Sequence, residues 1–136
     1  MAGYGLTVVV DAPFEEADRR TRAALAEQGF GVLTEIDVAA TLKKKLGVDV
    51  APQVILGACN PVLARRGLEV EPGLGLLLPC NVVVRVAEDG RTLVSALDPA
   101  VMVCVSGRPE LQPVADEATA RLRAALDALA GHGGNG

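Results

Sequence analysis

The stretch CNVVVRVAEDGRTLVSAL, residues 80–97, contains two runs rich in β-branched residues joined by a short polar segment. Asp89-Gly90 lies between the runs, and this dipeptide is favoured in the type I′ turn that links neighbouring antiparallel strands. We therefore predict a β-hairpin with a type I′ turn at Asp89-Gly90. A hairpin makes the sheet at least partly antiparallel, which favours an α+β domain over a doubly wound α/β domain.

Three units precede the hairpin, and each is a β-rich run followed by a signal that starts a helix. The signals are Pro13 with acidic residues after it, Asp37, and Asn60 followed by Pro61. Asp and Asn are preferred N-cap residues, and Pro suits the first helical position because that position needs no N–H donor. The predicted strands are 5–11, 30–37 and 52–59, and the predicted helices are 13–28, 38–46 and 61–71. In the second strand, Phe30, Val32, Thr34 and Ile36 alternate onto one face.

Helices are also predicted after the hairpin. Residues 98–109 lie between two turn signals and can hold a short helix that carries Met102 and Cys104 into the core. A long amphipathic helix follows and ends at Gly131. Its apolar positions recur at helical spacing and are Leu111, Val114, Ala115, Ala118, Leu122, Ala125, Leu126 and Leu129. Residues 131–136 contain the single histidine, His132, and are predicted to form a flexible Gly-rich tail.

Length and composition limit the fold and the partners. A chain of 136 residues fits one domain, which we place at residues 1–130 as a two-layer α+β domain with helices packed on its sheet. Half of the residues are hydrophobic but only three are aromatic, so the core is aliphatic. A net charge of −4 and the scarcity of aromatic stacking platforms argue against nucleic acid as a partner.

The sequence also points to a location in the cell. The N-terminus has no signal-peptide pattern, and no stretch approaches the roughly 18 apolar residues of a membrane span. Three cysteines without close spacing suit reduced thiols. We therefore expect a soluble cytoplasmic protein. The run Lys43, Lys44 and Lys45 lies just before Gly47, where cations offset the negative end of a helix dipole, so it is not interpreted as a phosphate site.

The dipeptide Cys-Asn occurs twice, in ILGACNP (55–61) and in LLLPCNVVV (76–84). Asn60 is explained as an N-cap, whereas Asn81 lies within a predicted strand, where Asn is disfavoured. A buried hydrogen bond, an edge position or a role in a site would each explain Asn81. Cys59 precedes a helix N-terminus, where a thiolate is favoured, and Cys80 approaches it if their strands are neighbours. The alternative is that both thiols are small apolar fillers.

No catalytic residue and no metal ligand is assigned. Zinc normally takes four ligands from Cys, His and carboxylates, and this chain has dispersed thiols with no Cys-x-x-Cys. A nucleophilic thiol needs a nearby base, and the only histidine lies in the predicted tail. The sequence therefore favours a protein that is not an enzyme, and it identifies no cofactor.

The stretch VILGACNPVLARRGLEVEPGLGLLLPCNVVV (54–84) resembles the domain-of-unknown-function 302 family, DUF302. The order of elements from GYGLTVVV to the last helix is similar as well, so the resemblance covers about residues 3–130. It implies a compact α+β fold like the TATA-box-binding-protein class, a tendency to form dimers, and occurrence in bacteria and archaea. It implies no established reaction, and a fold shared with DNA-binding proteins does not bring DNA binding with it.

Two classes of function follow from these residues. The first is a homodimeric binding or accessory module, in which the apolar loop 73–79 and the candidate site residues Cys59, Asn60, Cys80 and Asn81 hold a small molecule or a protein partner. The same loop can instead belong to the dimer interface or to the core. The second is a thiol-redox or soft-metal-handling protein that uses Cys59 and Cys80.

Overall fold

One antiparallel sheet of five strands organises the chain. The computed structural model describes the backbone of residues 3–134 and the side chains of residues 3–130. The strands lie in the order β1-β5-β4-β3-β2. The strands are β1 (Gly5–Val10), β2 (Gly31–Asp37), β3 (Gln53–Cys59), β4 (Cys80–Val86) and β5 (Thr92–Leu97). The predicted hairpin is confirmed as the pair β4–β5, which lies inside the sheet with β1 and β3 on either side. The predicted α+β class is likewise confirmed.

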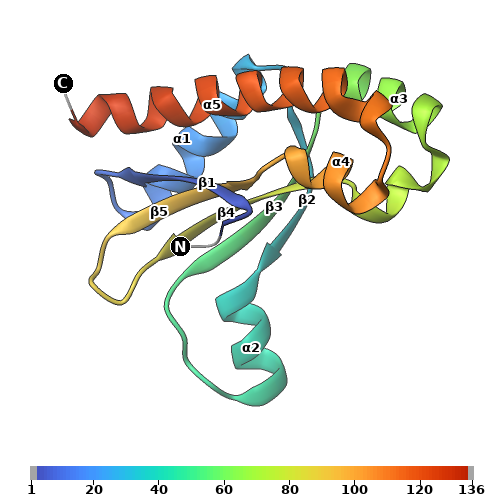
Figure 1. The fold of residues 1–136 in the computed structure, drawn as a ribbon. Coiled ribbons are helices and arrows are strands. Elements are labelled where there is room, and N and C mark those ends of the chain that lie inside the picture. The colour runs from blue at the N-terminus through green and yellow to red at the C-terminus, as the bar shows by residue number, and fades with distance from the viewer. Residues whose placement is uncertain (1–2, 135–136) are drawn as a thin grey trace.

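Helices cover one face of this sheet. Helix α5 (Gln112–Gly134) lies across that face beside α1 (Phe14–Glu27), as Figure 1 shows. The main core lies between them and the strands and is aliphatic apart from Phe30. Shorter segments gather at one end of α5: α3 (Pro61–Val70), the 3₁₀ helix η1 (Pro72–Leu77), α4 (Ala100–Ser106) and the 3₁₀ turn η2 (Pro109–Leu111). Within residues 3–134, no helix has the length and apolar character needed to cross a membrane.

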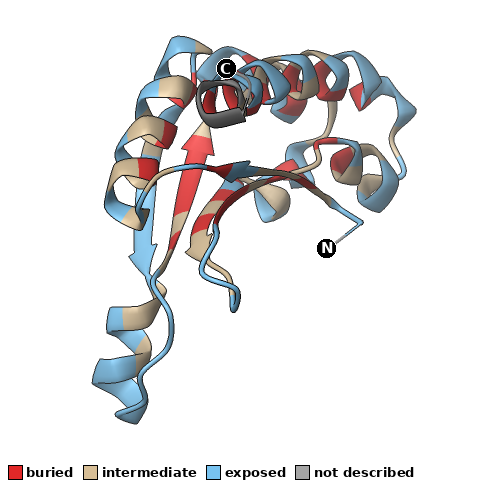
Figure 2. Ribbon diagram, turned by 90° about the vertical axis from the view of Figure 1, so that its left-hand side faces the viewer, coloured by how far each residue is buried: buried red, intermediate tan, exposed pale blue. Residues whose placement is uncertain are grey.

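No helix of residues 3–134 covers the opposite face of the sheet (Figure 2). Successive side chains of a strand point to opposite faces, so β4 presents Val82 and Val84 to the helices and Val83 and Arg85 to the other side. Val82 and Val84 are fully buried, whereas Val83 and Arg85 are only partly buried. We call this uncovered side the open face (Figure 2).

Helix α2 (Val38–Leu46) projects from the end of the sheet, away from the helical layer (Figure 1). Asp37 caps it as predicted, with its side chain accepting a hydrogen bond of 2.8 Å from the Ala40 N–H. Gly47 ends it in the left-handed conformation, and the three lysines occupy its last turn. None of its residues is buried. We call residues 38–50 the arm.

The hairpin turn differs from the predicted type I′ turn. That turn needs positive φ at both central residues, and here Gly90 has a φ of 88° while no non-glycine residue among those described has a positive φ. The Gly90 N–H donates to the Ala87 carbonyl at 2.9 Å, and the Ala87 N–H donates to the Arg91 carbonyl at 2.8 Å. The hairpin therefore closes with a three-residue loop, because Asp89 keeps an ordinary backbone and Gly90 alone adopts the left-handed one.

Strand β2 departs from the predicted alternation. The register between β2 and β3 shifts between Val32 and Thr34, so the residues on the two sides of this irregularity do not share one face. Ile36 is exposed, although it was expected beside Phe30, which is buried. The strand lies at the edge of the sheet, where a β-bulge of this kind is common.

Three further expectations need correction. Met102 is buried as predicted, but Cys104 is exposed, because two residues along a helix turn a side chain by about 200°. Segment 73–79 is not an irregular loop, since most of it forms η1 with Leu74 buried. Helix α5 continues past Gly131 to Gly134, so the predicted tail overlaps it. Residues 135 and 136 and the His132 side chain lie outside the described part of the chain.

Candidate functional site

Strands β3 and β4 are neighbours, so the two Cys-Asn pairs lie at the same end of the sheet. Ala58 is the cross-strand partner of Cys80, and Gly57 is the partner of Asn81. Because the strands are antiparallel, Cys59 lies one register position beyond the partner of Cys80, whereas Asn60 lies three positions beyond the partner of Asn81. The Cys59 and Cys80 thiols were expected to approach each other only if their strands are neighbours, and this condition is met.

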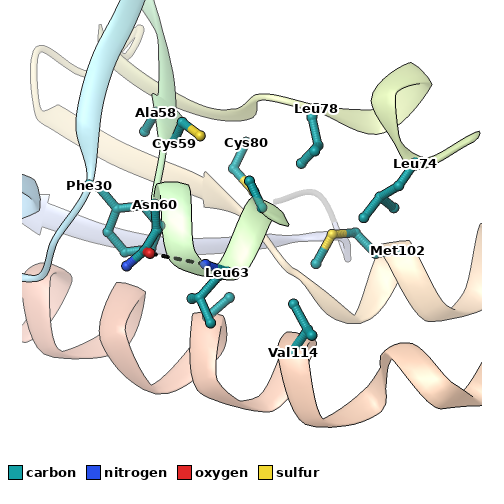
Figure 3. A pocket seen from close by; sticks show the side chains of 12 residues that line it. Phe30, Ala58, Cys59, Asn60, Leu63, Leu74, Leu78, Cys80, Met102 and Val114 are labelled. Atoms are coloured by element: carbon teal, nitrogen blue, oxygen red, sulfur yellow. Dashed lines mark hydrogen bonds between the residues drawn. The ribbon is translucent and has the colours of Figure 1, made fainter. Parts of the chain in front are cut away.

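Three of the four candidate residues, Cys59, Asn60 and Cys80, line one cavity. Its other walls are Phe30, Met102 and aliphatic side chains, which come from β3, α3, η1 and the residue after it, and α5. Figure 3 shows Leu74, Leu78 and Met102 on the side of the cavity that faces Cys80. The cavity volume is about 30 Å³. This space holds a water molecule but is well below the roughly 300–1,000 Å³ of ligand pockets, so a ligand of that size fits only if the lining side chains move.

Asn60 performs the predicted capping role. Its side-chain oxygen accepts a hydrogen bond of 3.2 Å from the Leu63 N–H in the first turn of α3, drawn as a dashed line in Figure 3. The residue is buried beside Gly29, the left-handed glycine that follows α1. A Cβ at Gly29 would lie 2.9 Å from the Asn60 amide nitrogen, so this glycine leaves room for the cap.

Cys80 is buried, and its environment opposes ionisation. Burial raises the pKa of the Cys80 thiol, and the nearby Cys59 raises it further as a smaller cause. The thiol is therefore protonated at neutral pH and is a poor nucleophile. Cys59 is half-buried and Cys104 is exposed, and all three cysteines are free. Among the described residues, no group of three or more His, Cys, Asp or Glu side chains is placed to hold a metal ion.

Asn81 is separated from the other three because it points to the open face, where it is exposed. There it lines a shallow hollow of about 410 Å³ whose floor includes Val83. The rim carries Arg85, Gln53 and the hydroxyl groups of Thr7 and Ser95. We call this feature the open-face hollow. Asn81 is not at an edge of the sheet, because β4 is an inner strand. Its side chain forms no hydrogen bond with the described residues, so its place in this surface hollow is the remaining explanation.

Sequence reasoning missed the polar neighbours of Asn81. Period-two alternation along β4 was available as a signal, and it places Asn81, Val83 and Arg85 on one face. Gln53 and Thr7 come from β3 and β1, so their place beside these residues depends on strand order and register. Neither of those can be read from one sequence.

Comparisons with known proteins agree with this architecture. The family model described as "Domain of unknown function DUF302" matches residues 6–129. A crystal structure of an uncharacterized conserved DUF302 protein from Bacillus stearothermophilus has 36% sequence identity and a TM-score of 0.87, and the match covers 94% of this chain and 99% of that one. No protein with a curated description matches. Because that family model spans nearly the whole domain, the chain belongs to the DUF302 family.

Proposed function

We propose that this chain is a homodimeric binding module and that the arm is the part that holds the second copy. The supporting observation is that the arm contributes no buried residue to its own domain. Leu46, Val48 and Val50 are 69%, 43% and 45% exposed. Isolated helices of this length are marginal in water, and helices are normally stabilised by packing an apolar face. A second copy supplies that packing and removes these aliphatic side chains from water.

The distribution of charge favours a second copy as the occupant. Three lysines and one aspartate give the arm a charge of +2, so the other residues carry −6 within the net charge of −4. Lys43 already pairs with Asp49 at 3.0 Å, which leaves Lys44 and Lys45 to face a partner. A basic arm is complementary to an acidic body of the same chain. In a two-fold dimer this contact occurs twice, with each arm on the other body.

Light scattering coupled to size-exclusion chromatography tests the proposal at micromolar concentration. The wild-type chain should elute as a dimer, and the double variant Leu46→Ser, Val48→Asp should elute as a monomer. The variant should keep its fold because neither side chain is buried. Circular dichroism checks that its β and helical signals are retained.

Val62→Ser is the matched control, because Val62 is 67% exposed on α3, away from the arm. It should remain a dimer. A wild-type chain that is monomeric at this concentration contradicts the proposal. So does a double variant that stays dimeric, because the interface would then lie elsewhere.

A thiol-redox or soft-metal role for Cys59 and Cys80 is a second candidate. The observation in its favour is that both residues line one cavity, and the raised pKa of Cys80 weighs against it. Metal analysis of the purified protein, together with mass spectrometry after mild oxidation, tests this role. The candidate requires either stoichiometric metal or a disulfide between these two residues, and finding neither removes it.

A further inference from the structure

We infer that the open-face hollow binds a small organic anion that also carries hydroxyl groups. The hollow is built around Val83 on β4. Asn81 and Arg85 lie two residues to either side of Val83 and share its face. Ser95 is the cross-strand partner of Val83, and Gln53 is the partner of Arg85. Six polar or charged side chains, including Thr7 and Tyr4, thus surround one small apolar floor.

Arg85 gives the hollow its charge. Arg85 is half-buried, and none of the ten residues that line the hollow is acidic, although the chain has 17 carboxylate residues. Among the side chains described, Arg85 forms no ion pair. A guanidinium group presents a planar set of donors that matches carboxylate and phosphate groups. A hollow with one such group and no competing acid is suited to an anion.

The remaining polar groups indicate the rest of the ligand. Asn81 and Gln53 carry amides that both donate and accept hydrogen bonds, and Thr7 and Ser95 carry hydroxyl groups that are 2.8 Å apart. Ligand hydroxyl groups also donate and accept, so they match this rim better than purely apolar substituents do. The volume of about 410 Å³ lies in the range of small-molecule sites. Val83 and Leu97 supply an apolar surface for the carbon skeleton.

This inference extends the proposed binding role by naming a ligand class, and it does not depend on self-association. Nitrogen-15 NMR titrations test it with four probes: glycerol 3-phosphate, gluconate, inorganic phosphate and glycerol. The two hydroxylated anions should shift the side-chain amide signals of Asn81 and Gln53 in a saturable manner. Inorganic phosphate should bind more weakly, and glycerol should cause no shift. The tighter of the two hydroxylated anions decides between phosphate and carboxylate.

Arg85→Gln should weaken the tighter probe by about tenfold, because it removes a charge-assisted pair of hydrogen bonds. Arg91→Gln removes the same charge from the exposed hairpin loop and should leave affinity unchanged. If Arg85→Gln disturbs the spectrum of the fold, Asn81→Ala serves as the second variant and should also weaken binding. Equal loss in the Arg91 variant, shifts scattered over the surface, or silence from all four probes overturns the inference.

Two results separate this inference from the dimer proposal. A monomeric chain that binds a hydroxylated anion in the hollow supports the ligand class and removes the dimer. A dimeric chain that binds none of the probes supports the dimer and removes the ligand class. Inorganic phosphate that binds as tightly as glycerol 3-phosphate overturns the hydroxyl part of the inference.

Discussion

The covered face and the open face of the sheet are built from the same strands but have different consequences. On β4, Cys80, Val82 and Val84 point toward the helices and are buried, whereas Asn81 and Arg85 point the other way. The covered face is almost wholly aliphatic, and the open face mixes polar and apolar side chains. One strand therefore divides stability and the candidate ligand contacts between alternate residues, and substitutions at neighbouring positions should have unequal effects on stability.

The largest contrast is expected between two consecutive residues of β3. Leu56 is fully buried on the covered face, so Leu56→Ala should lower the free energy of unfolding by about 3 kcal/mol through lost burial and a residual cavity. Ile55 is only partly buried on the open face, so Ile55→Ala should cost about 1 kcal/mol. Urea denaturation of both variants measures the difference. Equal losses would show that something covers the open face.

Asn60 provides a smaller, purely local effect. Asn60→Ala removes the acceptor for the Leu63 N–H, so the free energy of unfolding should fall by about 1 kcal/mol. Asn60→Asp keeps the acceptor at a helix N-terminus and should be tolerated. Urea denaturation again gives the values. An Asn60→Ala variant as stable as wild type would mean that the cap contributes nothing to stability. The Asp variant is the control, because it has nearly the same size as Asn and keeps the acceptor oxygen.

Features that depend on neighbouring residues could be predicted from the sequence. The caps at Asp37 and Asn60, the lysine-rich last turn before Gly47 and the hairpin each follow from a few consecutive residues. The turn type failed because it depends on the φ of Asp89, which the dipeptide alone does not determine. The irregularity in β2 has no local signal, since an edge strand tolerates it whatever the residues are.

The candidate site could be predicted only in part, because it also depends on contacts between residues far apart in the chain. Cys59, Asn60 and Cys80 meet because β3 and β4 are adjacent, a condition that the sequence analysis stated but could not decide. The open-face hollow joins Thr7 to Ser95, which are 88 positions apart in the chain. Only the sheet order brings such residues together. The sequence therefore identified Asn81 as unexplained without finding its neighbours.

The pH dependence of stability tests the burial of Cys80 on the covered face. Burial raises the pKa of its thiol above the ordinary value, so at alkaline pH the unfolded chain loses this proton before the folded chain does. The contribution of Cys80 to stability is thus fully present below the ordinary thiol pKa of about 8.5 and is lost as pH rises through the folded pKa. We expect Cys80→Ala to show a shallower fall in melting temperature toward alkaline pH than wild type.

Cys104→Ala is the control for this pH effect, because Cys104 is exposed and its substitution removes a cysteine without touching the covered face. Alkylation followed by mass spectrometry gives an independent measurement. Cys104 should react first and Cys80 last at mildly alkaline pH. Rapid alkylation of Cys80 in the folded protein would contradict its burial and would revive a reactive thiol at this position.

The smallest effect is expected at Asn81, the residue next to Cys80. Its side chain is exposed at the open-face hollow, so Asn81→Ser removes no buried hydrogen bond and should leave the melting temperature nearly unchanged. Differential scanning calorimetry measures this against Asn60→Ala, which changes the same residue type at a cap. A clear loss at Asn81 would mean that its amide joins buried groups between β4 and η1, and the two faces would then not divide stability as proposed. An unchanged melting temperature, combined with weaker binding of a hydroxylated anion, would assign Asn81 to the ligand alone.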